Sequence, residues 1–313
     1  MSLMLEVAHL SKQFKDTLAV NDLSFTVNEG DVYGFLGQNG AGKSTTLRML
    51  LTLIHPTSGE IHLFGKNILD HPNHALEQTG AVIERPDLYK YLSAYDNLYI
   101  FAKMSGIKPT QELIMKNLQL VGLSERAQSK VKTFSQGMKQ RLGIAVALVH
   151  NPRLVILDEP TNGLDPQGIA DMRQLILHLS RDLGKTVIVS SHLLNEIEQI
   201  ANRMIIIHKG SKIAEGNVAE LLDPGNTLVE LDTTDNPRAF SFLQQSSFTH
   251  GLEQKDGLIR LHMDRQEIPR LVETITTDGQ GILSVRPRHS LEDYFLSLTN
   301  PDTHVESPAN RIV

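Results

Sequence analysis

A glycine-rich loop near the amino terminus has the residue types and spacing of a phosphate-binding site. Its sequence is Gly37-Gln38-Asn39-Gly40-Ala41-Gly42-Lys43-Ser44, in which four residues separate the outer glycines and lysine and serine follow. The N–H groups of such a loop, and of the helix that it opens, point toward an anion. We therefore expect Lys43 to contact the β- and γ-phosphates of ATP and Ser44 to bind Mg²⁺. The expected nucleotide contacts continue through Thr45 and Thr46. The other interpretation, a purely structural glycine turn, does not explain the lysine and serine.

Two adjacent carboxylates follow an apolar run at Leu154-Val155-Ile156-Leu157-Asp158-Glu159. Successive side chains of a strand point in opposite directions, so the two acids face different tasks. Asp158 is predicted to take part in the coordination shell of the metal ion, and Glu159 is predicted to polarise an attacking water molecule. Alone, the pair has a second interpretation, a solvated strand end. The phosphate loop upstream favours the catalytic interpretation.

The segment Phe134-Ser135-Gln136-Gly137-Met138-Lys139-Gln140-Arg141 opens an apolar helix 23 residues before Asp158. It resembles the signature motif of the ABC ATPases, usually leucine-serine-glycine-glycine-glutamine. Ser135 and Gly137 match that motif, whereas Gln136 and Met138 depart from it. A helix N-cap explains Ser135 alone, but not the ordered set of motifs.

Further motifs of the same family follow in its usual order. Gly163-Leu164-Asp165 resembles the D-loop, and His192, which follows Ser190-Ser191, resembles the switch histidine. The resemblance implies that His192 contacts the γ-phosphate and helps to orient Glu159. An isolated histidine is more often structural. Phe14 matches the aromatic residue that stacks on adenine in this family, although a core phenylalanine is the competing interpretation.

The resemblance covers residues 3–222 and implies an ATP molecule held between two subunits. The phosphate loop of one subunit faces the signature of the other, so Ser135, Gly137 and Asp165 are expected to serve nucleotide bound by a partner. The chain has one such cassette. We therefore expect a second ATPase subunit. The leading expectation is a second copy of this chain, in a homodimer, and the alternative is a related chain.

One position departs from the general family pattern. Glu84 follows Ala81-Val82-Ile83, where most members have the glutamine of the Q-loop. With Arg85-Pro86-Asp87-Leu88-Tyr89, it resembles the exporters associated with resistance to bacitracin and lantibiotics. Glu84 is either a further Mg²⁺ ligand or a surface acid. Four of the six tyrosines, Tyr89, Tyr91, Tyr95 and Tyr99, follow directly, and in the family this segment meets the transmembrane subunit.

These motifs require an α/β fold that carries them at strand ends. Apolar runs at 31–36, 154–157 and 186–190 alternate with helical stretches from Lys43, at 167–183 and at 194–201, which predicts a largely parallel sheet. Residues 93–150 predict a helical insertion. Together, residues 1–222 are expected to form a P-loop ABC ATPase domain.

A second, small α+β domain is expected at 227–299, after the turn sequence Asp223-Pro224-Gly225-Asn226. We predict strands at 227–231, 247–253, 258–262 and 282–287 and helices at 237–245 and 265–276, with a turn at Asp256-Gly257. This βαββαβ order resembles a ferredoxin-like unit, and a regulatory or dimer-stabilising role is the expectation. A short helix at 291–298 and a disordered tail at 300–313 are predicted to follow. Three histidines there, His250, His262 and His289, are scattered without metal-ligand spacing.

The composition of the chain argues against several classes of partner and site. A net charge of −6 and a pI near 6.1 give no electrostatic reason for nucleic-acid binding. The absence of cysteine excludes disulfides and thiolate sites. Residues 1–10 lack a signal-peptide pattern, and the most apolar stretch, 142–157, is interrupted by polar residues and proline. Transport therefore requires a separate transmembrane permease. We expect a peripheral protein at the cytoplasmic face of the cell membrane, soluble when expressed alone.

The leading hypothesis is an ATP-hydrolysing transporter subunit that exports a drug, peptide or lipid-like substrate. A soluble ABC ATPase acting on ribosomes, DNA or assembly factors is the alternative. Such proteins typically join two cassettes or insert coiled coils or zinc sites, and this chain has one cassette, no heptad run and no cysteine. A metabolic kinase shares the phosphate loop, but it does not explain the signature, the acid pair and His192 together.

Overall fold

The computed structural model describes residues 2–221, 227–255 and 257–288. The chain divides into two compact units, Met1–Val218 and Ala219–Val313, each with its own buried apolar cluster. The predicted linker at 223–226, the helix at 291–298 and the tail at 300–313 lie outside the described residues, as do Asp256 and His289. In the described part of the chain, no helix is both long and apolar enough to cross a bilayer.

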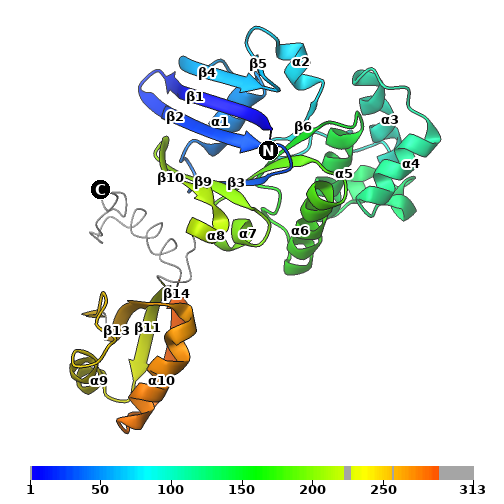
Figure 1. Cartoon of the computed structure of the whole chain (residues 1–313). Helices are drawn as coiled ribbons and strands as arrows, with labels where there is room; N and C mark the ends of the chain where they lie inside the picture. The colour runs from blue at the N-terminus through cyan, green and yellow to red at the C-terminus, as the bar shows by residue number, and fades with distance from the viewer. Residues whose placement is uncertain (1, 222–226, 256, 289–313) are drawn as a thin grey trace. The chain divides into compact units, whose positions relative to one another are not determined.

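A six-stranded sheet forms the centre of the first unit (Figure 1). Its order is β10-β9-β3-β8-β7-β6, and every neighbouring pair is parallel except β9 and β10. The predicted parallel sheet is therefore confirmed. Its strands are β3 (Val32–Leu36), β6 (Thr79–Val82), β7 (Leu154–Asp158), β8 (Thr186–Ser191), β9 (Arg203–His208) and β10 (Ser211–Asn217).

The strands β3, β7 and β8 are buried at every position, as expected for parallel strands covered on both faces. Five helices accompany this sheet along the chain. The helix α1 (Lys43–Leu50) follows β3, α2 (Pro72–Leu76) precedes β6, α6 (Pro166–Arg181) joins β7 to β8, α7 (Leu194–Glu198) joins β8 to β9, and α8 (Val218–Leu221) follows β10. The helix predicted at 194–201 is shorter than expected. Ala201 N still donates to Ile197 O, so the chain turns there before it enters β9.

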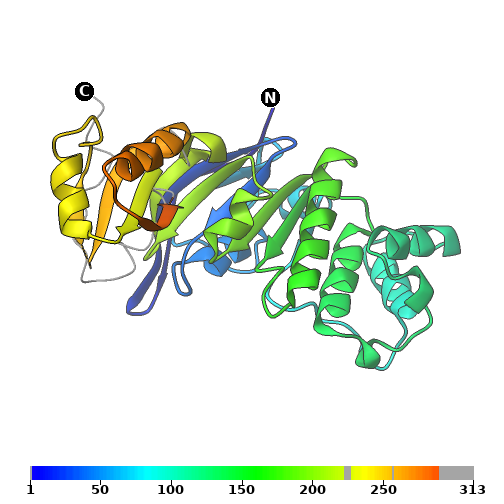
Figure 2. The ribbon, with the colours of Figure 1, turned by 90° about the horizontal axis from the view of Figure 1, so that it is seen from below.

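The predicted helical insertion is confirmed between β6 and β7. It contains α3 (Ala94–Met104), α4 (Gln111–Leu120), the short 3-10 turns η1 (Ser124–Arg126) and η2 (Val131–Thr133), and α5 (Gln136–Leu148). Figure 2 shows these helices gathered at one end of the first unit. A capping box at Ser93 and Asp96 starts α3. The last helix, α5, returns to the sheet and packs beside β6.

A second, antiparallel sheet was not separated in the sequence analysis. Its order is β2-β1-β4-β5, from β1 (Leu3–Phe14), β2 (Thr17–Asn28), β4 (Ser58–Leu63) and β5 (Lys66–Asn67). The alternating burial of β1 and β2 shows that one face of each strand packs on the core. This sheet positions Phe14 at the end of β1, next to the turn that leads into β2.

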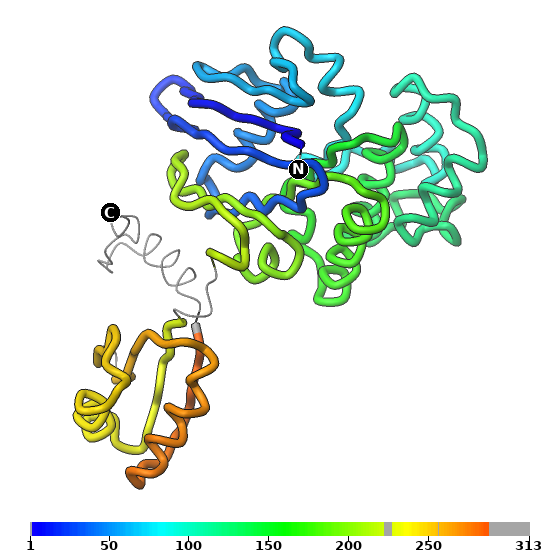
Figure 3. The backbone as a smooth tube through the Cα atoms, in the orientation of Figure 1, coloured from blue at the N-terminus to red at the C-terminus, as the bar shows by residue number. Residues whose placement is uncertain are grey.

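The second unit has the predicted βαββαβ order (Figure 3). Its antiparallel sheet has the order β12-β13-β11-β14. The elements are β11 (Thr227–Thr233), α9 (Asn236–Leu243), β12 (Glu253–Lys255), β13 (Leu258–Met263), η4 (Arg265–Glu267), α10 (Ile268–Thr277) and β14 (Ile282–Arg288).

One prediction for the second unit was wrong. The strand predicted at 247–253 is reduced to β12, because Phe248 N bonds to Ser246 Oγ and Gly251 has a φ of 61°, which forms a loop. Two of the three histidines of this unit lie together: His262 N donates to His250 O, and the two rings lie 6.1 Å apart.

Candidate ATP site

The phosphate loop lies between β3 and α1, where the sequence predicted it. Gly40 and Gly42 have φ values of 81° and 103°, in the region that favours glycine. A Cβ atom on Gly42 would lie 2.5 Å from the carbonyl oxygen of Ala19, so no larger residue fits. The first turn of α1 has neither a side-chain cap nor an acidic residue. Its N–H groups and favourable dipole potential therefore suit an anion.

Lys43 connects this loop to the acid pair. Its Nζ atom donates to the carbonyl oxygens of Gly37 and Gln38, at 2.6 and 3.2 Å. It also lies 3.0 Å from Glu159 Oε1, an ion pair whose angle does not make a hydrogen bond. The side chain is only 5% exposed. A buried ammonium group is thus held at the mouth of the phosphate loop, facing a carboxylate.

The acid pair stands at the end of β7 and is held by the neighbouring strand β8. Asp158 is 1% exposed, and its Oδ1 accepts a hydrogen bond from Ser190 Oγ at 2.6 Å. The same hydroxyl accepts from Glu159 N at 2.9 Å. Glu159 has a φ of 49°, a conformation that costs about 1 kcal/mol for a residue with a side chain. The bond to Ser190 holds the backbone in it.

His192 completes the cluster from the residue after β8. Its Nδ1 atom lies 2.7 Å from Glu159 Oε2, so Glu159 stands between an imidazole and the Lys43 ammonium. The structure therefore brings the three predicted catalytic residues together. Such an arrangement can fix the orientation of a carboxylate that accepts a proton from water.

The remaining residues of the predicted nucleotide contact lie on the first turn of α1. Ser44 and Thr45 are half-buried there. Thr46 is fully buried, and its hydroxyl donates to Gly42 O at 3.0 Å. The side chain of Thr46 is therefore engaged within its own helix.

Two predicted contacts lie in more exposed surroundings. Glu84 has a side chain that is 63% exposed and pairs with Arg48 in the last turn of α1. Phe14 is also exposed, with Lys12 Nζ 4.9 Å from the centre of its ring. An exposed aromatic ring does not fit the competing interpretation of a core phenylalanine, and its free area suits stacking.

The signature and D-loop residues meet each other. Ser135 caps α5, and its Oγ accepts from Met138 N at 3.2 Å. Asp165 caps α6, accepting from Gly168 N at 3.0 Å. A Cβ atom on Gly137 would lie 3.7 Å from Leu164 of the D-loop. The amino-terminal ends of α5 and α6 therefore form one surface. Lys43, Glu159 and His192 form a separate cluster.

The tyrosines are not equivalent. Tyr91 is 80% exposed, whereas Tyr89 is about half exposed, with its ring 5.9 Å from that of Phe101. Tyr99 is less exposed and lies under Lys103, and Tyr95 is half-buried. Tyr91 thus presents the largest free aromatic surface in this segment.

Sequence patterns did not indicate the roles of three residues that hold the site. Ser190 fixes the acid pair, Arg48 binds Glu84, and Glu196 accepts hydrogen bonds from Thr161 and Ser191. Ser190 and Ser191 were visible beside His192, and their small hydroxyls at a strand end were the available signal. Arg48 is far in sequence from Glu84, and Glu196 is far from Thr161, so no local pattern indicated these two contacts.

Several known proteins are similar in sequence to this chain. The ABC transporter family model matches residues 20–162. The chain is 41% identical to the bacitracin transport ATP-binding protein BcrA of Bacillus licheniformis, over 97% of this chain and 99% of that protein. It is 42% identical to the lantibiotic transport ATP-binding protein SrtF of Streptococcus pyogenes, over 68% of this chain and 90% of that one.

Solved structures show the same cassette. The ATP-binding cassette MJ0796, in a dimeric post-hydrolysis state bound to ADP and Pi, superposes with a TM-score of 0.62 and 25% identity. It covers 69% of this chain and 99% of its own. ATP-binding subunits of this family work with transmembrane components and form dimers. The predicted family resemblance is confirmed: this chain belongs to the ATP-binding subunits of ABC transporters and is an ATP hydrolase.

Proposed function

We propose that Glu159 is the base for hydrolysis, oriented by His192, and that Lys43 holds the β- and γ-phosphates. The contact of Glu159 with both His192 and Lys43 carries this proposal. A carboxylate held from two sides needs little reorganisation when it takes a proton from the attacking water. Binding of phosphate would draw Lys43 away from Glu159, because the phosphate oxygens compete for the same ammonium group.

We propose Mg²⁺ as the ion that accompanies ATP, with Ser44 and Asp158 as its protein contacts. The donor set fits, because Mg²⁺ prefers a few oxygen ligands together with phosphate and water. When bound, the ion neutralises charge on the phosphates as the bond to the leaving group breaks. Asp158, buried and fixed by Ser190, supplies a preorganised carboxylate. Glu84 can bind the ion only if its ion pair with Arg48 breaks.

The proposed active form is a homodimer with ATP between its subunits. Phe14 stacks on adenine, the loop 37–46 binds the phosphates, and Ser135, Gly137 and Asp165 act on ATP held by the other subunit. The surface shared by Gly137 and Leu164, together with the dimeric cassette of the comparison, supports this arrangement.

We propose that the chain drives export of a drug, peptide or lipid-like substrate through a separate permease, at the cytoplasmic face of the cell membrane. The names of the bacitracin and lantibiotic relatives favour a peptide antibiotic within this range. The alignment with BcrA spans 97% of the chain, which supports a role for residues 227–299 beyond the cassette, in regulation or dimer stability.

Paired variants test these catalytic roles. Glu159→Gln should bind ATP but lower hydrolysis by at least about 100-fold, because an amide keeps the shape and cannot accept the proton. ATP-bound dimers should accumulate. Lys43→Ala should instead fail at nucleotide binding. Exposed Glu77→Gln, at the end of α2, serves as the matched control. Wild-type turnover by folded Glu159→Gln would reject the assignment of the base.

A further inference from the structure

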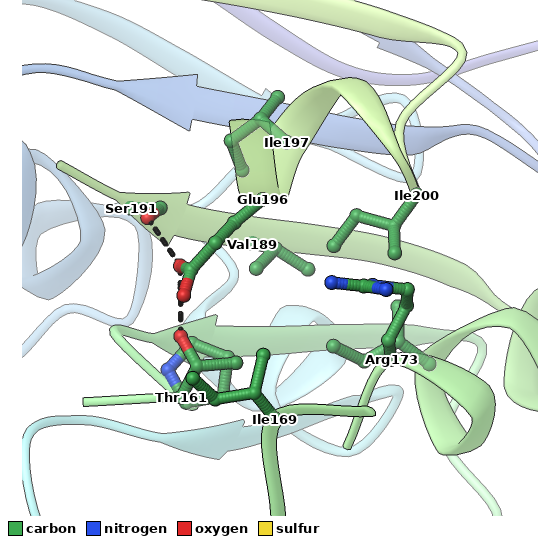
Figure 4. A pocket seen from close by; sticks show the side chains of 10 residues that line it. Thr161, Ile169, Arg173, Val189, Ser191, Glu196, Ile197 and Ile200 are labelled. Atoms are coloured by element: carbon green, nitrogen blue, oxygen red, sulfur yellow. Dashed lines mark hydrogen bonds between the residues drawn. The ribbon is translucent and has the colours of Figure 1, made fainter. Parts of the chain in front are cut away.

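Glu196 links the two segments that carry Glu159 and His192. Its Oε2 atom accepts a hydrogen bond from Thr161 Oγ1 at 2.8 Å and from Ser191 Oγ at 2.7 Å. Figure 4 shows both bonds converging on this one carboxylate. Thr161 is two residues after Glu159, and Ser191 directly precedes His192. One side chain on α7 therefore contacts both of the segments that carry Glu159 and His192.

The sheet does not pair these two segments with each other at Thr161 and Ser191, although Ser191 stays in register with Leu36 of β3. The backbone pairing of β7 with β8 ends at Asp158 and Ser190. Beyond that point Thr161 O accepts from Leu164 N, which begins the D-loop turn. Ser191 Oγ accepts from Leu193 N, which begins α7. Fixing Thr161 and Ser191 thus fixes the start of the D-loop and the base of the His192 side chain.

The surroundings favour a structural acceptor over a ligand site. The carboxylate lies beside a cavity of about 10 Å³ whose lining includes the apolar side chains of Ile169 and Ile197 and also the charged side chain of Arg173 (Figure 4). This volume holds no more than about one water molecule. A partly buried carboxylate is costly unless it is hydrogen-bonded, and the bonds from Thr161 and Ser191 satisfy half-buried Glu196.

We propose that Glu196 is a positioning residue for ATP hydrolysis. It holds Thr161 and Ser191 at one distance from each other, which keeps Glu159 and His192 in hydrogen-bond contact and moves the D-loop together with the switch histidine. The inference rests on the proposed roles of Glu159 and His192. Glu196 itself has no role as a base and no contact with ATP.

A different role for Glu196 makes an opposite prediction. Glu196 lies in the first turn of α7, where a negative charge favours the helix dipole. That role depends on charge, whereas the proposed link depends on an acceptor oxygen. Since both hydroxyls donate to the same oxygen, the side-chain carbonyl of glutamine can accept both bonds. Glu196→Gln therefore separates the two explanations.

The test measures kcat, KM and ATP affinity for four variants of the full chain. Glu196→Ala and Thr161→Val remove the link and should lower kcat by roughly 10- to 100-fold, because small displacements of catalytic groups have effects of this size. Glu196→Gln and Thr161→Ser keep the acceptor and the donor, and should retain most of the activity. ATP affinity should stay unchanged in all four. Gln199→Ala, exposed on the turn after α7, is the control.

A second measurement tests whether Glu196 acts through His192. In a His192→Ala background, Glu196→Ala should lower kcat by a smaller factor than in the parent protein. The contribution of Glu196 that acts through His192 is already absent there. Equal factors in both backgrounds would reject the role through His192.

The outcomes distinguish this inference from the proposed function. If Thr161→Val hydrolyses ATP like the parent, or if Glu196→Gln falls as far as Glu196→Ala, the linking role is wrong. Thr161→Val keeps the side-chain shape, so it decides the question even if Glu196→Ala unfolds. Glu159→Gln is assayed beside them. An active Glu159→Gln would reject the proposed base, whereas an inactive one beside an unimpaired Thr161→Val would reject only the inference on Glu196.

Discussion

A single added methyl group at Gly143 tests how closely α5 packs against the segment after Glu84. A Cβ atom on Gly143 would lie 2.4 Å from Pro86 Cβ and 2.9 Å from Pro86 Cγ. Carbon atoms prefer separations of about 3.5–4.0 Å, so Gly143→Ala must push the two elements apart by roughly 1 Å. Overpacking of this kind costs about 1–3 kcal/mol. For a domain of this size, each kcal/mol lowers the Tm by roughly 2–4 °C.

We therefore expect Gly143→Ala to lower the Tm by roughly 2–12 °C. Because α5 begins at the signature and Pro86 precedes the tyrosines, the displacement should also reduce hydrolysis more than ATP binding. The phosphate loop lies on another element and is not displaced directly. Thermal unfolding followed by fluorescence, nucleotide binding and ATPase assays measure the three quantities.

The double variant Gly143→Ala with Pro86→Gly removes both clashing ring carbons and provides the control. It should be more stable than the sum of the two single changes predicts, since the residues are in contact. A Gly143→Ala protein with the parent Tm and ATPase activity would refute the close packing. Additive losses in the double variant would show that the destabilisation arises elsewhere.

Two further predictions concern the partners of the chain. A mixture of Lys43→Ala and Ser135→Ala subunits can form dimers with one intact and one doubly defective site, so ATPase activity should partly recover. If one intact site suffices for hydrolysis, the absence of recovery despite demonstrated subunit exchange would count against shared sites. Replacing both Tyr89 and Tyr91 by alanine should leave ATP binding and basal hydrolysis intact but weaken copurification with the permease and uncouple transport, because Tyr91 is 80% exposed and Tyr89 about half exposed. Loss of nucleotide binding with normal permease association would instead assign these rings to the core.

Local patterns predicted most of the first unit. The strands at β3, β7 and β8 were recognisable because parallel strands buried on both faces are continuously apolar, and α1 because it follows the glycine-rich loop. The antiparallel sheet of β1, β2, β4 and β5 was missed. Its hairpins β1–β2 and β4–β5 are local, but the pairing of β1 with β4 that joins them into one sheet is nonlocal. The strand at 247–253 was wrong because a side-chain bond from Ser246 and the left-handed Gly251 override β propensity there.

The sequence by itself determined the chemistry of this protein. The proposed phosphate binding depends on glycines, Lys43 and Ser44 at fixed spacing in one continuous loop, and the acid pair and His192 each stand at a predictable strand end, so their types and order suffice for this proposal. Tertiary structure alone decided which of these groups touch. The order of β7 and β8 in the sheet places Glu159 beside His192, and α1 brings Arg48 to Glu84. Glu196 meets Thr161 for the same reason: contacts between residues distant in sequence follow from strand order and helix packing, which no local spacing encodes.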